Sequence, residues 1–203
     1  MVNSVSLAIA ALALFISSLT AWLTLLRSGT VRMTQPTTIF LGHDNRSADG
    51  LAHPKVYLRT LLYATAKRGC IVENMYLRVH RGETTQVFNV WVFGEERLAR
   101  GSGLFVSEAG VVVNHHFLLP ADGTRFTFLP GSYAVDVLAT IVGRKISIRL
   151  GSIQIAISPE QSVELATTES GIFFDWSPDA ASYHAHIEPS KRRLPNISPF
   201  DSL

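Results

Sequence analysis

Histidines and a carboxylate near the C-terminus form the pattern with the clearest chemical meaning. In "HAHIE", His184, His186 and Glu188 occupy alternate positions. Alternate residues of an extended chain lie on one side, so a strand here would bring two imidazoles and a carboxylate together. Such ligands hold zinc or iron. The pattern fits either a metal site or a surface strand with incidental polar residues, and a metal site would also need further supporting partners.

The other histidines and the single cysteine offer weaker patterns. His115 and His116 are adjacent, and adjacent strand residues point to opposite faces, so the two do not ordinarily bind one ion. His115 shares a face with Phe117, which predicts a partnered, half-buried histidine. Cys70 is followed by no histidine until His80, which argues against a copper site built from a cysteine and closely following ligands.

Motif and composition checks favour a protein without catalysis. The sequence has no G-x-S-x-G, Walker A or H-E-x-x-H motif. One cysteine allows no intramolecular disulfide. The 18 basic and 16 acidic residues form no long basic run, so nucleic-acid binding is not predicted. We therefore expect no enzyme, no cofactor and no nucleic-acid partner.

Short strands are the elements that must position these residues. Residues 74–82 and 85–94 alternate apolar and polar side chains around Arg81-Gly82-Glu83-Thr84, which predicts a β-hairpin. Pro36 predicts an edge strand or a bulge in its own stretch. Further strand-like stretches cover residues 30–41, 55–66, 103–120, 125–143 and 152–158. About seven strands separated by short turns, with no helical period outside the N-terminus, predict an all-β antiparallel sandwich.

One stretch carries a resemblance to a known class of domain. "FLPGSYAVDVLA" (128–139) resembles the F-strand region of immunoglobulin-like and fibronectin type III-like modules, where a turn glycine precedes a tyrosine and alternating apolar residues. The resemblance implies an immunoglobulin-like sandwich over most of 30–158, without the disulfide of antibody domains. The chain is also similar to bacterial membrane-anchored proteins, from which no function is carried over.

The N-terminus predicts a membrane-spanning helix. Val5 to Leu26 is a run of 22 apolar or small residues, about 33 Å long as a helix, and a bilayer core is about 30 Å thick. A signal peptide is the alternative, but it would have a basic start and a shorter apolar core. Trp22 lies near the end of the run, where interfacial aromatic residues are common.

Basic residues after the helix predict the orientation of the chain. No Lys or Arg precedes the helix, whereas Arg27, Arg32 and Arg46 follow it. The positive-inside rule therefore places the β-domain in the cytoplasm.

A stripe of small residues runs along the same helix with a heptad spacing. Its members are Ser6, Ala10, Ala13, Ser17, Thr20 and Thr24. Such stripes let membrane helices approach closely, although small residues are also common in membrane helices in general. The stripe therefore predicts either self-association of the helix or no specific contact.

These observations divide the chain into segments and leave three functions open. The segments are a short N-terminus (1–4), a transmembrane helix (5–26), a linker (27–30), a β-sandwich (31–158), an extension packed on the sandwich (159–188) and a flexible tail (189–203). The first hypothesis is a membrane-anchored module that binds a protein partner or forms homo-oligomers. The second is a metal-binding sensor or metal-dependent enzyme that uses His184, His186 and Glu188. The third is a periplasmic or surface envelope or adhesion module.

Overall fold

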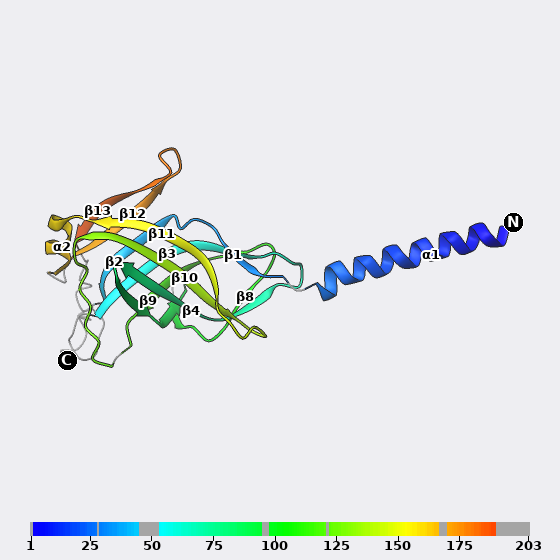
Figure 1. Ribbon diagram of the computed structural model, residues 1–203, viewed down its shortest axis with the longest axis horizontal. Helices are drawn as coiled ribbons and strands as arrows, with labels where there is room; N and C mark the ends of the chain where they lie inside the picture. The colour runs from blue at the N-terminus through cyan, green and yellow to red at the C-terminus, as the bar shows by residue number, and fades with distance from the viewer. Residues whose placement is uncertain are drawn as a thin grey trace, which may run out of the picture.

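The computed structural model describes residues 2–27, 29–44, 53–94, 98–120, 122–166 and 170–189. An N-terminal helix, α1, projects from one end of a β-domain built from two antiparallel sheets (Figure 1). The helical elements are α1 (Val2–Ala21), a wider π-type turn directly after it (Trp22–Leu26) and α2 (Pro159–Ala166). The strands are β1 (Val31–Met33), β2 (Thr38–Asp44), β3 (His53–Ala64), β4 (Cys70–Arg81), β5 (Thr84–Phe88), β6 (Val90–Phe93), β7 (Ala99–Arg100), β8 (Leu104–Val106), β9 (Val111–Leu118), β10 (Gly131–Ile141), β11 (Ile148–Ile157), β12 (Ser170–Ser177) and β13 (Ser182–Pro189).

The two sheets differ in size. The larger sheet has the order β13-β12-β2-β3-β9-β6-β7, and β1 pairs with the C-terminal end of β3. The smaller sheet has the order β11-β10-β4-β5, and β8 pairs with the start of β4. The predicted C-terminal extension contains α2 and the β12–β13 hairpin. This hairpin extends the larger sheet, because β12 pairs with β2. The predicted flexible tail lies outside the described residues from 190 onward.

One hydrophobic core lies between the sheets, and the period-two pattern of the sequence places its side chains. In β4, Met75, Leu77 and Val79 are buried, as the alternation predicts, and in β11 Ile153 and Ile155 are buried. The predicted hairpin is present as β4–β5, with Arg81 paired to Thr84. Pro36 separates β1 from β2, and both strands pair with β3.

The alternation from residue 85 to residue 94 predicts one strand, and this prediction is wrong. The chain leaves the smaller sheet after Phe88 and enters the larger sheet at Val90. Phe88 and Trp91 are three residues apart, yet both are buried, because each faces the core from a different sheet. The crossing at Asn89 changes the phase of the pattern, and a single-strand interpretation does not allow for it.

Helix α2 lies where the sequence pattern predicts no helix, although its first residues carry a recognisable helix-start signal. The Ser158 hydroxyl accepts a hydrogen bond from the Gln161 amide at 3.2 Å, and the Ser158 amide donates to the Gln161 side chain at 2.8 Å. This reciprocal pair is a capping box, and Pro159 occupies the favoured first helical position. Eight residues are too few for a clear helical period, so only the cap in "SPEQ" could have predicted α2.

Helix α1 makes no buried contact with the domain. Residues Asn3–Leu26 are long and apolar enough to cross a membrane, and none of the most apolar part of this segment is buried. A signal sequence would meet the same criteria of length and composition. In the predicted small-residue stripe, the hydroxyls of Thr20 and Thr24 donate to the carbonyls of Ile16 and Thr20, each at 2.8 Å. Self-association of this helix stays a prediction.

Tyr133 ties the start of β10 to the loop before it. Its ring is buried, and its hydroxyl donates to the Leu129 carbonyl at 2.5 Å. We expect Tyr133→Phe to lower the free energy of unfolding by about 1–3 kcal/mol, because the partly buried bond is lost without a replacement. Urea unfolding of the detergent-solubilised full chain measures this change. Tyr63→Phe, at an exposed tyrosine, is the control and should change stability by less than about 0.5 kcal/mol. Equal stability of the Tyr133 variant and the wild type would contradict this role.

Candidate functional site

A pocket of about 530 Å³ lies between β11 and the β12–β13 hairpin. We call it the β11 pocket. Its lining residues are Gln35, Ser132, Ser152, Ile153, Gln154, Ile155, Ala156, Phe174, Trp176, Ala181, Ser182, Tyr183 and Ala185. Amides, hydroxyls, aliphatic and aromatic side chains are all represented, and none of these residues is charged. A charged small molecule would find no counter-ion here, whereas a neutral polypeptide segment would find both polar and apolar contacts.

Strand β11 forms one wall of this pocket and is the last strand of the smaller sheet. It pairs with β10 from Gly131↔Ile157 to Ala139↔Ile148. Among the described strands, none pairs with its other side. Gln154 and Ala156 are exposed, and the isoleucines that alternate with them are buried. A strand edge of this kind offers backbone donors and acceptors to a further strand.

The opposite wall is held in place by Tyr183. Its hydroxyl donates to the Pro36 carbonyl at 2.8 Å and accepts from the Gln35 side chain at 2.9 Å. Burial raises the pKa of Tyr183 to about 12, and the Gln35 bond opposes part of that rise. The phenol is therefore neutral at physiological pH. Trp176 packs edge-on against Tyr183 with ring centroids 5.1 Å apart, so this aromatic wall is formed before any ligand binds.

The predicted metal ligands lie on β13, next to this pocket but on the other face of the strand. Tyr183 and Ala185 line the pocket. His184, His186 and Glu188 alternate with them, so they share the opposite face, and all three are exposed.

The surroundings of His186 are those of a surface cluster. Its ring stacks on Phe173 with centroids 5.6 Å apart. Its Nδ1 lies 3.4 Å from an Asp175 oxygen, and its Nε2 lies 3.5 Å from a Glu188 oxygen. Both contacts are ion pairs when the imidazole is protonated. Within the described ranges, no three His, Cys, Asp or Glu side chains are arranged to hold one ion. The metal hypothesis stays a prediction.

The remaining predicted residues are placed as follows. Arg27 ends the helical segment, with its amide bonded to the Trp22 carbonyl at 2.8 Å, and Arg32 is exposed on β1. Arg46 lies outside the described residues. His115 is fully buried rather than half-buried, because Trp91 supplies a partner from the neighbouring strand. The Trp91 indole donates to His115 Nδ1 at 3.1 Å.

The β11 pocket is not predictable from the sequence alone. Its walls come from several separate segments between Gln35 and Ala185, and no motif links them. The only signal was the period-two pattern of β11, with isoleucines on one side and Ser152, Gln154 and Ala156 on the other. That pattern predicts a half-buried strand, but it does not say whether the strand is central or at an edge.

Taken together, the fold defines a class: a two-sheet antiparallel β-domain preceded by an apolar N-terminal helix. No family model matches this chain. No curated protein matches it either. Among solved structures, the chain is similar to the CooA pilin subunit from enterotoxigenic Escherichia coli, with 12% identity over 64% of this chain and 97% of the pilin chain, and a TM-score of 0.32. A likeness at this level carries no argument about fold or function.

Proposed function

We propose that this chain is a single-pass membrane-anchored protein whose β-domain binds an extended segment of a partner protein along β11. The observation that carries this proposal is the open edge of β11 beside an uncharged, preformed pocket. Strand addition draws affinity from main-chain hydrogen bonds and specificity from pockets for alternate side chains. The edge of β11 offers the backbone groups, and the β11 pocket offers contacts for side chains. Trp176 and Tyr183 are aromatic residues of the kind that dominate binding energy at interfaces.

The anchor in this proposal is α1 with the turn after it. The segment spans a bilayer by length, and its apolar side chains have no place in the core of the domain. The arginines after it and the lack of basic residues before it support a cytoplasmic domain. A secreted or envelope module is the competing proposal, and it requires the opposite orientation.

The connectivity that we propose for the domain is immunoglobulin-like. The order β2-β3-β9-β6 corresponds to strands A-B-E-D of that fold, and β5-β4-β10-β11 corresponds to C′-C-F-G. The Tyr133 hydroxyl bond to Leu129, just before β10, corresponds to the tyrosine corner at the start of strand F. In this scheme the binding edge is strand G, and the β12–β13 hairpin is an addition beyond strand A.

Site-specific photocrosslinking tests the binding edge in the full-length protein in cell membranes. A benzophenone amino acid replaces Gln154 at the edge, and a matched variant carries it at Thr85, which is exposed on β5 at the other end of the same sheet. We expect one discrete protein adduct from position 154 and none from position 85. Adding Ser152→Lys and Ala156→Lys should strongly reduce that adduct, because edge lysines oppose strand addition.

Two outcomes of this experiment would contradict the proposal. The first is equal adduct formation from positions 154 and 85, which would mean unspecific contact. The second is an adduct of twice the chain mass, which would make the site an interface between two copies of the chain.

A further inference from the structure

The end of the β-domain nearest α1 carries a surface of mixed basic and apolar side chains. We call it the proximal face. It consists of Lys67, Arg68, Ile71, Phe105, Val142, Arg144, Lys145 and Ile146. The exposed fractions of its apolar members are 80% for Ile146, 59% for Phe105, 56% for Val142 and 46% for Ile71. Large apolar side chains at this exposure, grouped at one end of a domain, indicate a surface that contacts something other than water.

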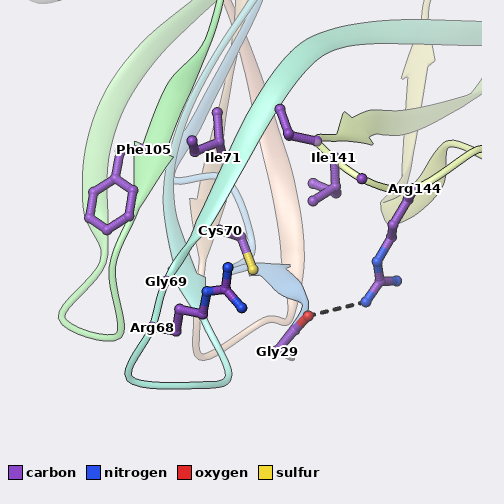
Figure 2. A pocket seen from close by; sticks show the side chains of 10 residues that line it. Gly29, Arg68, Gly69, Cys70, Ile71, Phe105, Ile141 and Arg144 are labelled. Atoms are coloured by element: carbon purple, nitrogen blue, oxygen red, sulfur yellow. Dashed lines mark hydrogen bonds between the residues drawn. The ribbon is translucent and has the colours of Figure 1, made fainter. Parts of the chain in front are cut away.

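The proximal face surrounds a second pocket of about 370 Å³ (Figure 2). Arg68, Ile71, Phe105, Val142 and Arg144 all line it, so segments distant in sequence meet at one place. In Figure 2, Phe105 and Ile71 lie on one side of this pocket and Arg144 on the other.

The linker from the helix is bonded directly to this face. The Arg144 guanidinium donates to the Gly29 carbonyl at 3.1 Å. Thr30 and Thr65 exchange two further bonds, each of 2.9 Å: the Thr30 amide donates to the Thr65 hydroxyl, and the Thr65 amide donates to the Thr30 carbonyl. The turns after β3 and β10 are therefore tied to the point where the chain enters the domain.

The short linker between the apolar helix and the domain limits the distance of the proximal face from the bilayer. Four residue steps separate Leu26, the end of the apolar run, from Thr30. Even a fully extended chain covers only about 14 Å in four steps. The polar layer of one leaflet is about 5–8 Å thick, which is half the difference between the full bilayer and its hydrocarbon core. Side chains on turns tied to Gly29 and Thr30 therefore lie within reach of the lipid headgroups.

The proximal end of the domain is also more basic than the opposite end. The described segments at the proximal end, which are the turns 65–69 and 142–147 and strand β8 with its flanks (101–110), contain four basic residues and one acidic residue, Glu108. The described segments at the opposite end, residues 81–84 and 122–130 and helix α2 with its cap (158–166), contain two arginines and four acidic residues. Basic residues close to a membrane are attracted to anionic lipids by about 1 kcal/mol each.

We infer that the proximal face docks on the surface of an anionic membrane, with its apolar side chains in the interface and its basic side chains on lipid phosphates. The inference rests on the proposed anchor. It adds that the domain has a fixed orientation against the bilayer. The β11 edge then extends along the side of the domain, away from the lipid.

Spin-label depth measurements on the full chain reconstituted in vesicles test this inference. In a Cys70→Ser background, a nitroxide is attached at Ile146→Cys or, as the distal control, at Glu83→Cys. With phosphatidylglycerol in the vesicles, we expect the ratio of oxygen to nickel-complex accessibility at position 146 to exceed that at 83 several-fold. Lys67→Glu/Lys145→Glu should bring the ratio at 146 close to the distal value. The distal pair Arg81→Glu/Arg125→Glu should leave it unchanged.

Three results separate failure of the docking from failure of the anchor. A label at 146 that is as aqueous as the label at 83, in protein that floats with the vesicles, would overturn the inference and keep the anchor. Equal immersion with and without anionic lipid, unaffected by charge reversal, would overturn the role of the basic residues. Protein that does not float with the vesicles would overturn the anchor itself and, with it, the inference.

Discussion

Leu12→Arg/Ile16→Arg is expected to abolish stable membrane association of the full chain. Both residues lie near the middle of the apolar segment, four positions apart and therefore on one face of α1. An arginine at the centre of a membrane helix costs about 2.5–3.5 kcal/mol on the insertion scale, and each lost Leu or Ile removes about 0.5 kcal/mol of favourable transfer. The pair therefore costs about 6–8 kcal/mol, which corresponds to a change of more than four orders of magnitude in the insertion equilibrium.

Alkaline carbonate extraction of membranes measures this effect as the fraction of full-length chain kept in the pellet. Leu25→Arg/Leu26→Arg is the matched control, because it makes the same change next to Arg27, where arginine side chains reach the headgroups. We expect the control to stay in the pellet and the central pair to be lost from it. Unchanged retention of the central pair would mean that α1 does not hold the protein in the membrane.

His115 should make the stability of the domain depend on pH between about 6.5 and 4. Burial, together with a smaller electrostatic effect of the neighbouring His116, lowers the pKa of His115 from 6.5 to about 4. In the unfolded chain the imidazole takes up a proton near pH 6.5, whereas the folded state resists protonation down to about pH 4. The contribution of neutral His115 to the free energy of unfolding is therefore fully present above pH 6.5, the pKa in the unfolded chain. It falls as the pH drops, by about 3 kcal/mol in total at 1.36 kcal/mol per pH unit.

The hydrogen bond to Trp91 explains why protonation disturbs this site. His115 Nδ1 accepts from the indole, so the neutral ring carries its proton on Nε2. Protonation would turn Nδ1 into a donor that faces another donor. The buried Nε2 has no hydrogen-bond partner among the described residues, so no acceptor is in place to offset the cost of the added charge.

Urea unfolding at a series of pH values, compared with His115→Gln, isolates this contribution. Glutamine keeps an acceptor for Trp91 but does not titrate in this range. We expect the stability difference between wild type and variant to shift by about 3 kcal/mol against the wild type from pH 7 to pH 4. His184→Gln, at an exposed histidine, is the control and should follow the wild type. Parallel curves for wild type and His115→Gln would contradict the buried neutral imidazole.

The longer strands of the two-sheet core were predictable because one face of each is buried. Tyr133, Val135 and Val137 show this in β10, where polar or small residues alternate with large buried ones. The break between Phe88 and Trp91 was not predictable from the same pattern, because it depends on which sheet each residue joins. Full burial of His115 depended on Trp91, which is 24 residues away and comes from a neighbouring strand.

The candidate sites were predictable only where they follow from local chain properties. The apolar helix and its flanking arginines are local features, and so is the shared face of His184, His186 and Glu188 in β13. The β11 pocket and the proximal face each combine turns or strands that are distant in sequence. Lys67-Arg68 and Arg144-Lys145 are two basic pairs far apart in the sequence, and only the β3–β4 and β10–β11 turns bring them to one end of the domain.

Protease accessibility of a C-terminal epitope tag in intact cells tests the central claim, an uncleaved N-terminal anchor with a cytoplasmic β-domain. We expect the tag to be protected in intact cells and to be cut once the membrane is opened. We also expect the protected protein to have the mass of the full chain. Cleavage of the tag in intact cells would place the domain outside the cytoplasm, and a chain shortened by the length of the apolar segment would identify that segment as a removed signal sequence.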